Sequence, residues 1–212
     1  RQIGLRHKVG WCLAHGGAKA RAVEAKISCP YGMSADEPDE LLCEGAELVR
    51  FEQYDAFMEK QHAMLACVGV HDEDGACAYL PALEAELQRY QEQAYVLDPF
   101  LERLVTPVAQ TMRAQVLESS CMCMEPVARL LYMYTKVRGY KVVSRFFPHQ
   151  VRELPLLLDA LERFESPTWE CLYVLLLWLS SMVLVPFPLH RGTPSPAERI
   201  HRLSTRFLSR PG

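Results

Sequence analysis

The eight residues Tyr134 to Lys141 read YTKVRGYK, in which three cations and two tyrosines surround one glycine. Apolar residues upstream recur at the three- and four-residue spacing of a buried helix face: Val127, Leu130, Leu131 and Tyr134. We expect this helix to begin near Pro126 and to end at Gly139, because glycine takes positive φ at little steric cost. The stretch therefore predicts a corner between two helices.

A second, shorter helix is predicted after this glycine, with two apolar pairs facing the core: Val142, Val143, Phe146 and Phe147. Lys136 and Arg138 then lie at the carboxyl end of the first helix, where cations interact favourably with unpaired carbonyls. Lys141 and Arg145, four residues apart, lie on the outer side of the second helix. We call these four residues, Lys136, Arg138, Lys141 and Arg145, the basic ridge.

Three interpretations of the basic ridge remain open. It is a solvated corner that complements the helix dipole, a surface that binds a partner, or a grip for nucleic acid. Nucleic-acid binding through base stacking requires exposed aromatic rings, and we expect Tyr134 and Tyr140 to lie in the core. The whole chain carries 23 Lys and Arg against 26 Asp and Glu, a net charge of −3, whereas nucleic-acid-binding domains usually carry an excess of cations.

Similar helical signals recur along the chain, and prolines stand at expected first-turn positions. Helices are predicted to open at Leu80-Pro81, Asp98-Pro99, Ser166-Pro167 and Ser195-Pro196. Pro107 falls within one apolar stripe, where it predicts a kink. The chain shows no convincing strand pattern. The predicted fold is all-α, a stack of antiparallel helix pairs that resembles a HEAT or armadillo solenoid.

Two further helical patterns bear on whether a segment spans a membrane and on which face of the last helix meets solvent. The uncharged run from Cys171 to Val185 is about 15 residues long, below the roughly 20 needed to span a bilayer. It predicts a core helix covered on all sides, with Trp169 and Trp178 in or near the core. Four arginines at helical spacing near the end of the chain predict the solvated side of a last helix: Arg199, Arg202, Arg206 and Arg210.

Motifs for catalysis and for cofactor or metal binding are not found in the sequence. The eight cysteines form no CxxC pair, and no histidine lies at zinc-finger spacing from a cysteine pair, which favours free thiols in a reducing compartment. The sequence holds no GxxxxGK loop and no GxSxG elbow. We therefore expect no catalytic residue, no cofactor and no metal, and a protein that is not an enzyme.

The amino-terminal part differs in composition from the rest. Residues 1–32 lack clear periodicity, and an acidic stretch begins at Met33. We expect residues 1–38 to be a disordered or non-native leader, and residues 39–212 to be the amino-terminal helical-repeat domain of a longer protein.

Four segments resemble the tubulin-folding cofactor D family in the same order. They are RYQEQAYVLDPFLERLV from Arg89, YTKVRGYKVVSRFFPHQV from Tyr134, WECLYVLLLWLSSMVLVPF from Trp169 and the closing FLSRPG. The resemblance runs from Arg89 to Gly212 and covers the amino-terminal portion of a family whose members are several times longer.

This resemblance implies a cytoplasmic, cytoskeleton-associated chaperone built of HEAT-type repeats, with no catalytic chemistry of its own. The implied partners are β-tubulin, tubulin-folding cofactors C and E, and an ARF-like small GTPase, without nucleic acid or membrane. The implied activity is assembly and disassembly of the tubulin heterodimer after the chaperonin, with stimulation of GTP hydrolysis by tubulin. The alternatives are a generic helical-repeat scaffold and a nucleic-acid binder that uses the basic ridge.

Overall fold

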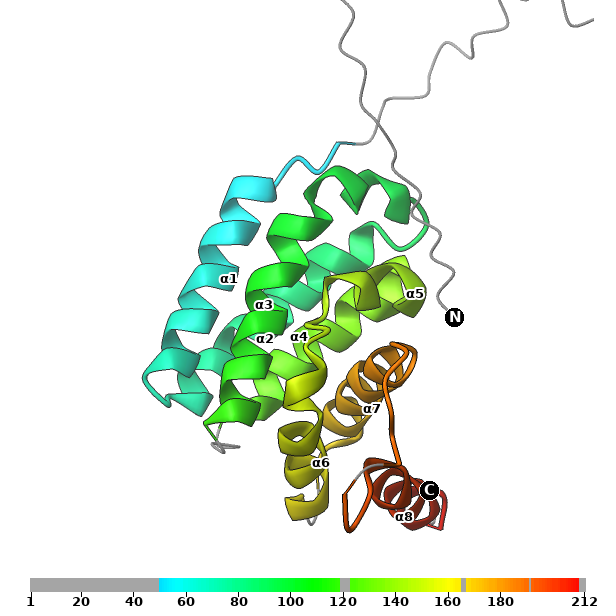
Figure 1. Ribbon diagram of the computed structural model, residues 1–212. Helices are drawn as coiled ribbons and strands as arrows, with labels where there is room; N and C mark the ends of the chain where they lie inside the picture. The colour runs from blue at the N-terminus through cyan, green and yellow to red at the C-terminus, as the bar shows by residue number, and fades with distance from the viewer. Residues whose placement is uncertain (1–49, 119–122, 165–166, 191, 210–212) are drawn as a thin grey trace, which may run out of the picture. The chain divides into compact units, whose positions relative to one another are not determined.

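The computed structural model describes residues 50–118, 123–164, 167–190 and 192–209 (Figure 1). The expected leader, residues 1–38, and the first part of the expected domain, residues 39–49, lie outside the described residues. So do Ser166 and Arg210.

The described residues form helices joined by turns and contain no strand. The α-helices are α1 (Tyr54–Gly69), α2 (Glu73–Arg89), α3 (Leu101–Leu117), α4 (Met124–Arg138), α5 (Tyr140–Val143), α6 (Leu154–Arg163), α7 (Trp169–Val183) and α8 (Pro196–Leu208). Short 3-10 helices are η1 (Ala94–Phe100), η2 (Ser144–Phe146) and η3 (Val151–Glu153). The all-α prediction is confirmed for this part of the chain.

The longer helices pack in two layers. One layer runs from α1 to α3, α6 and α8, and the other runs from α2 to α4 and α7. Helices that follow one another in sequence also pack across the layers, α1 on α2, α3 on α4, and α6 on α7 (Figure 1). This is the stack of antiparallel helix pairs that the apolar stripes predict, because each pair can bury its inner face only against its neighbours.

The α2 helix begins earlier than predicted. It starts at Glu73, where the Asp72 carboxylate accepts a hydrogen bond of 2.9 Å from the Gly75 backbone N–H. This cap satisfies one of the unpaired amides at the helix start. Pro81, predicted to open the helix, lies inside it. The prediction of a start at Leu80-Pro81 was wrong because the cap chemistry lies eight residues upstream.

The residues before α3 also differ from the prediction. Asp98 and Pro99 lie in η1 rather than at a helix start, and no side chain caps α3. The Asp98 carboxylate instead forms an ion pair with Arg138 at the end of α4. A contact between residues 40 apart in sequence gives no local pattern, so the cap prediction failed there. Pro107 lies inside α3.

The predicted corner after α4 is present. Gly139 has φ of 96° and its backbone N–H donates to the Thr135 carbonyl, which ends the helix as expected. The following helix is split into α5 and η2. Of its two apolar pairs, Val143 and Phe147 are buried, and Val142 and Phe146 pack against the core from partly buried positions.

Helix α7 is buried on one side only. Trp178 is fully buried and its indole N–H donates to the Pro148 carbonyl at 2.7 Å. Trp169 and Tyr173 are 58% and 36% exposed, so the expectation of a helix covered on all sides was wrong. Only the α4 and α6 sides of α7 are packed extensively by described helices. No helix in the described residues is both long enough and apolar enough to span a membrane.

Two polar contacts with buried members join segments that are distant in sequence. The Gln61 side chain of α1 donates from Nε2 to the Leu104 carbonyl of α3 at 2.9 Å and accepts on Oε1 from the Tyr134 hydroxyl of α4. Arg113 of α3 forms a bidentate ion pair with the buried Glu153 carboxylate, with Nε 2.9 Å from Oε2. Burial raises the pKa of the Tyr134 phenol well above its usual value, so the hydroxyl keeps its proton for Gln61.

Helix α8 begins with the predicted Ser195-Pro196 pair. The Ser195 hydroxyl accepts from the Glu198 backbone N–H, and the Glu198 carboxylate accepts from the Ser195 backbone N–H. This reciprocal capping box satisfies two amides that would otherwise be unpaired.

The sequence predicted that the arginine stripe of α8 faces solvent, but the structure shows that only part of it does. Arg199 lies 2.6 Å from Asp159 and 2.9 Å from Glu162 of α6, and Arg206 donates to the backbone carbonyls of Glu162 and Phe164. Arg202 is exposed. The acceptors lie about 40 residues away in sequence, so the helical spacing alone could not reveal them.

Candidate partner-binding surface

The basic ridge lies at the corner where α4 ends and α5 begins. The structure places Lys136 and Arg138 in the last turn of α4, Lys141 in α5 and Arg145 in η2. Lys136, Lys141 and Arg145 are exposed. Among the described residues these three cations form no ion pair, so their charges are open to a partner.

Arg138 differs from the other members of the basic ridge. Its guanidinium forms a bidentate pair with the Asp98 carboxylate, with Nη2 2.8 Å from Oδ2. Hydrogen bonding from Arg138 lowers the pKa of the Asp98 carboxyl, with the attraction of the positive charge as a further cause, against the opposing effect of burial. Arg138 therefore fastens η1 to the end of α4, and its charge is already compensated.

The two tyrosines of the corner have different environments. Tyr134 is buried, as expected, but Tyr140 is 50% exposed. The Lys141 ammonium lies 6.0 Å from the centre of the Tyr140 ring. The prediction that both rings lie in the core was wrong for Tyr140, because the short α5 helix buries only Val143. The corner thus offers three cations and one aromatic ring.

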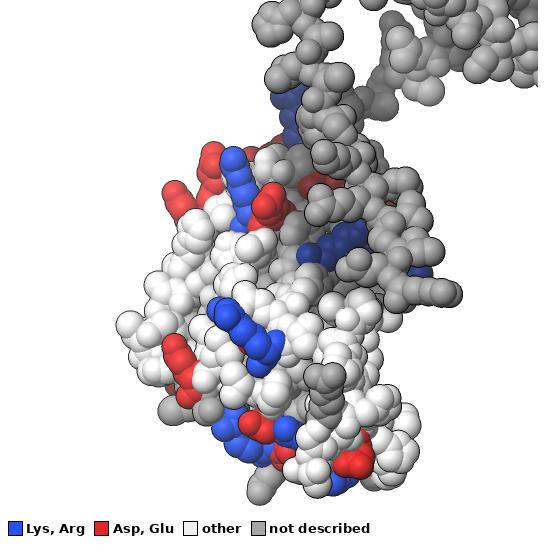
Figure 2. All heavy atoms as spheres, viewed as in Figure 1, with Lys and Arg blue, Asp and Glu red and all other residues white. Residues whose placement is uncertain are grey.

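Charges elsewhere are mixed. Figure 2 shows Lys, Arg, Asp and Glu side chains scattered over one face, with wide uncharged areas between them. This distribution agrees with the net charge of −3. The surface shown is therefore not uniformly basic, and the basic ridge is a local group of cations.

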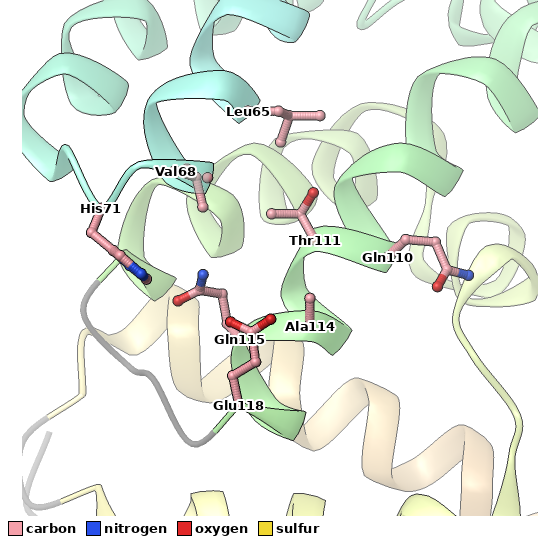
Figure 3. A pocket seen from close by; sticks show the side chains of 9 residues that line it. Leu65, Val68, His71, Gln110, Thr111, Ala114, Gln115 and Glu118 are labelled. Atoms are coloured by element: carbon pink, nitrogen blue, oxygen red, sulfur yellow. The ribbon is translucent and has the colours of Figure 1, made fainter.

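A pocket of about 360 Å³ lies between α1 and α3. The carboxyl-terminal part of α1 and the turn after it form one wall, and the last two turns of α3 form the other. Figure 3 shows the side chains of His71, Gln115 and Glu118 facing one another at one end, with Leu65 and Val68 on the α1 side. The pocket therefore has a polar end and an apolar wall.

The sequence interpretation missed this pocket, although Gln115 carries a signal. Gln115 lies three residues after Met112 on the apolar stripe of α3, where a leucine or valine is expected. The residue is 4% exposed, and its Oε1 accepts no hydrogen bond from the described residues. A polar residue at a core position of a helix indicates either a buried network or a binding site.

Two cysteines lie near the amino ends of α2 and α4. Burial raises the pKa of the Cys77 thiol, and the nearby carboxylates of Glu125 and Glu73 raise it further. Burial likewise raises the pKa of Cys123, with Glu73 and Asp72 as further causes. Both thiols therefore stay protonated at neutral pH, whereas thiolate chemistry requires a lowered thiol pKa. No cluster of His, Cys, Asp and Glu in the described residues could hold a metal ion.

Comparison with known proteins places most of these helices in one family. Residues 87–211 match the family described as tubulin-specific chaperone D-like, ARM repeat. The tubulin-folding cofactor D of Schizosaccharomyces pombe is 30% identical over 128 residues. That alignment covers 59% of this chain and 11% of the yeast protein. No solved structure matches the chain significantly.

Proposed function

The chain belongs to the tubulin-specific chaperone D-like family of ARM-repeat proteins, and on this premise we propose that it acts in tubulin folding as a binding segment without catalysis of its own. The matched residues include every member of the basic ridge. Three exposed cations that form no ion pair with any described residue, beside a half-exposed tyrosine, are the observation that supports a contact with an acidic protein surface.

The partner we propose is β-tubulin. The chain would hold it during assembly and disassembly of the tubulin heterodimer, in the cytoplasm and in contact with the cytoskeleton. Cofactors C and E and an ARF-like small GTPase would complete the assembly that stimulates GTP hydrolysis by tubulin. Because the chain spans 11% of the length of the yeast relative, we assign to it one contact surface and not this whole cycle.

The basic ridge would act mainly on recognition. Exposed cations that face an acidic partner raise the association rate and favour one orientation more than they add affinity. Salt weakens such contacts, because the Debye length falls to about 8 Å at physiological ionic strength. Arg138 would act indirectly, since its pairing with Asp98 fixes the corner that presents the other three cations.

Charge reversal tests this proposal. The 212-residue chain is titrated with labelled β-tubulin, and the triple variant Lys136→Glu, Lys141→Glu, Arg145→Glu is compared with the unchanged chain. We expect the variant to bind at least about tenfold more weakly, equivalent to about 1.4 kcal/mol. Its association rate should also lose most of its dependence on salt.

A matched control separates the basic ridge from net charge. The triple variant Lys60→Glu, Arg163→Glu, Arg202→Glu changes the net charge equally at exposed positions on α1, α6 and α8. It should bind like the unchanged chain. Equal weakening by both triple variants would show a non-specific charge effect, and a folded chain that binds no β-tubulin would refute the proposal.

A further inference from the structure

The solvent side of α4 is formed by few residues. Up to Val137, every residue of this helix is buried except Glu125, Arg129, Tyr132 and Lys136. Their spacing of four, three and four residues places them on one face of the helix. Because α4 packs on α2 and α7 within its layer and on α3 across the layers, this face belongs to the outer surface of the layer.

Two aromatic rings of α7 extend this surface. Trp169 and Tyr173 lie one helical turn apart, and both are exposed. Both rings pack edge-to-face with the Tyr132 ring, at centroid distances of 4.6 Å for Trp169 and 5.5 Å for Tyr173. We call Tyr132, Trp169 and Tyr173 the aromatic patch. The contacts hold the three rings against one another, so the patch is preorganised before any partner arrives.

A patch of this composition is typical of a surface that binds another protein. Tryptophan and tyrosine are enriched among the residues that contribute most to the affinity of protein complexes. Aromatic rings that serve only to pack α7 in the helix stack would be covered, as Trp178 of the same helix is. The exposure of Trp169 and Tyr173 therefore has no purpose in the packing of the described helices.

The aromatic patch adjoins the basic ridge. Lys136 follows Tyr132 by four residues, a distance of about 6 Å along the helix axis, and the other free cations of the ridge follow beyond the end of α4. In the other direction along α4, the Arg129 guanidinium lies 3.1 Å from the Glu84 carboxylate of α2. Of the cations on this face of α4, Lys136 is the one without an ion pair to a described residue.

The charges around the patch determine how an occupant lies on it. Glu170 follows Trp169 and is partly exposed, and Glu125 lies about two turns before Tyr132 on the solvent side of α4. A carboxylate of the partner meets repulsion at that end of the patch and attraction at Lys136. An acidic partner therefore places its carboxylates over the basic ridge and an uncharged side chain over the rings.

We propose that the aromatic patch binds an apolar side chain of the same acidic polypeptide segment that the basic ridge recognises. This inference rests on the proposed function and adds the chemistry of the partner, a segment in which carboxylates stand beside an exposed apolar or aromatic side chain. The carboxylates pair with the cations of the ridge, and the apolar side chain packs on Trp169 and Tyr173. The ridge thus acts on association, and the patch acts on the lifetime of the complex.

The first test measures both rate constants with the 212-residue chain and labelled β-tubulin. Trp169→Ala and Tyr173→Ala should each raise the dissociation rate at least about tenfold, with little change in the association rate or in its dependence on salt. The charge-reversed triple variant of the basic ridge should instead mainly lower the association rate. Tyr95→Ala removes an exposed tyrosine ring from η1 and serves as the control, with both rates unchanged.

The second test observes Trp169 without removing any contact. The chain is produced with 5-fluorotryptophan, and the ¹⁹F signal of Trp169 is assigned by its loss in Trp169→Phe. Saturating β-tubulin should shift this signal and protect it from broadening by a soluble gadolinium chelate. The signal of Trp178, which is buried in the free chain, is the internal reference and should not change.

The outcomes separate this inference from the proposed function. If β-tubulin binds and the ridge variant weakens it, but Trp169→Ala and the ¹⁹F signal show no effect, only the role of the aromatic patch is refuted. A chain that binds no β-tubulin refutes both. A Trp169 signal that shifts as the chain alone is concentrated, with a dimer in sedimentation velocity, would assign the patch to a second copy and overturn the inference.

Discussion

Gln61 in the middle of the helix stack and Gln115 at the α1–α3 pocket are both buried glutamines on helix faces that otherwise carry apolar residues. The Gln61 amide donates to α3 and accepts from α4, so both of its polar atoms are paired. The Gln115 oxygen accepts no hydrogen bond from any residue that the structure describes. The paired glutamine joins three helices, whereas the oxygen of the second is closed off from solvent without a hydrogen bond from the described residues. Burial alone therefore does not tell whether a polar side chain stabilises the stack, because an unpaired buried acceptor costs free energy that a paired one does not.

The largest expected effect concerns the paired charges of Arg113 and Glu153. Arg113→Ala leaves the Glu153 carboxylate buried without its partner, which should lower the free energy of unfolding by about 3 kcal/mol. Urea denaturation measures this loss. The double variant Arg113→Met, Glu153→Leu should recover most of the stability, because it removes both charges. A double variant as unstable as Arg113→Ala would contradict the interpretation that the unpaired charge causes the loss.

The next effect concerns Gln61 itself. Gln61→Leu removes the acceptor of the buried Tyr134 hydroxyl and one donor to the Leu104 carbonyl, so the free energy of unfolding should fall by about 2 kcal/mol. Adding Tyr134→Phe removes the stranded hydroxyl. The double-mutant cycle should therefore show a favourable coupling of about 1 kcal/mol between the two residues. Purely additive losses would mean that the two side chains do not depend on each other.

Gln115→Leu should have the opposite sign. It removes an unpaired buried acceptor and continues the apolar stripe, so the free energy of unfolding should rise by about 1 kcal/mol. Thermal and urea unfolding of Gln61→Leu and Gln115→Leu, measured side by side, compare the same substitution in the two regions. Destabilisation in both would give Gln115 the structural role that Gln61 has.

The smallest effect concerns Asp98 at the corner that bears the basic ridge. Arg138 lowers the pKa of Asp98 in the folded chain, so the ion pair contributes stability above the unfolded pKa, near 3.9, and this contribution is lost as pH falls through the lower folded pKa. Because the Asp98 side chain is 42% exposed, Asp98→Asn should lower stability by only about 0.5 kcal/mol at pH 7. The difference between the two chains should vanish in strong acid, and a difference independent of pH would exclude this pair as its cause.

Local signals account for the parts of the fold that the sequence predicted. The apolar stripe predicted upstream of Gly139 is buried in α4, Gly139 ends that helix, and Ser195 caps α8. The family resemblance from Arg89 onward agrees with the matched residues 87–211. Each of these signals lies within one helix or one segment of the chain.

The errors involve contacts between distant segments. Asp98 was expected to cap a helix but pairs with Arg138, and Arg199 was expected in solvent but pairs with α6. Pairing across 40 residues depends on how helices pack, which periodicity does not specify. The sequence could predict that the four cations of the basic ridge lie close together. It could not predict that Arg138 is neutralised by an ion pair with Asp98. The pocket could be suspected only from one glutamine in an apolar stripe.

Helix α8 has a different mode of attachment from the helices before it. It buries one side chain completely, Leu203, whereas Ile200 and Phe207 remain partly covered. Much of its remaining contact to α6 comes from Arg199 and Arg206. A segment held by few buried apolar groups opens at a lower free energy than the core. Its backbone amides should therefore exchange with deuterium well before those of α4, and raised ionic strength should hasten their exchange while the central helices keep their protection.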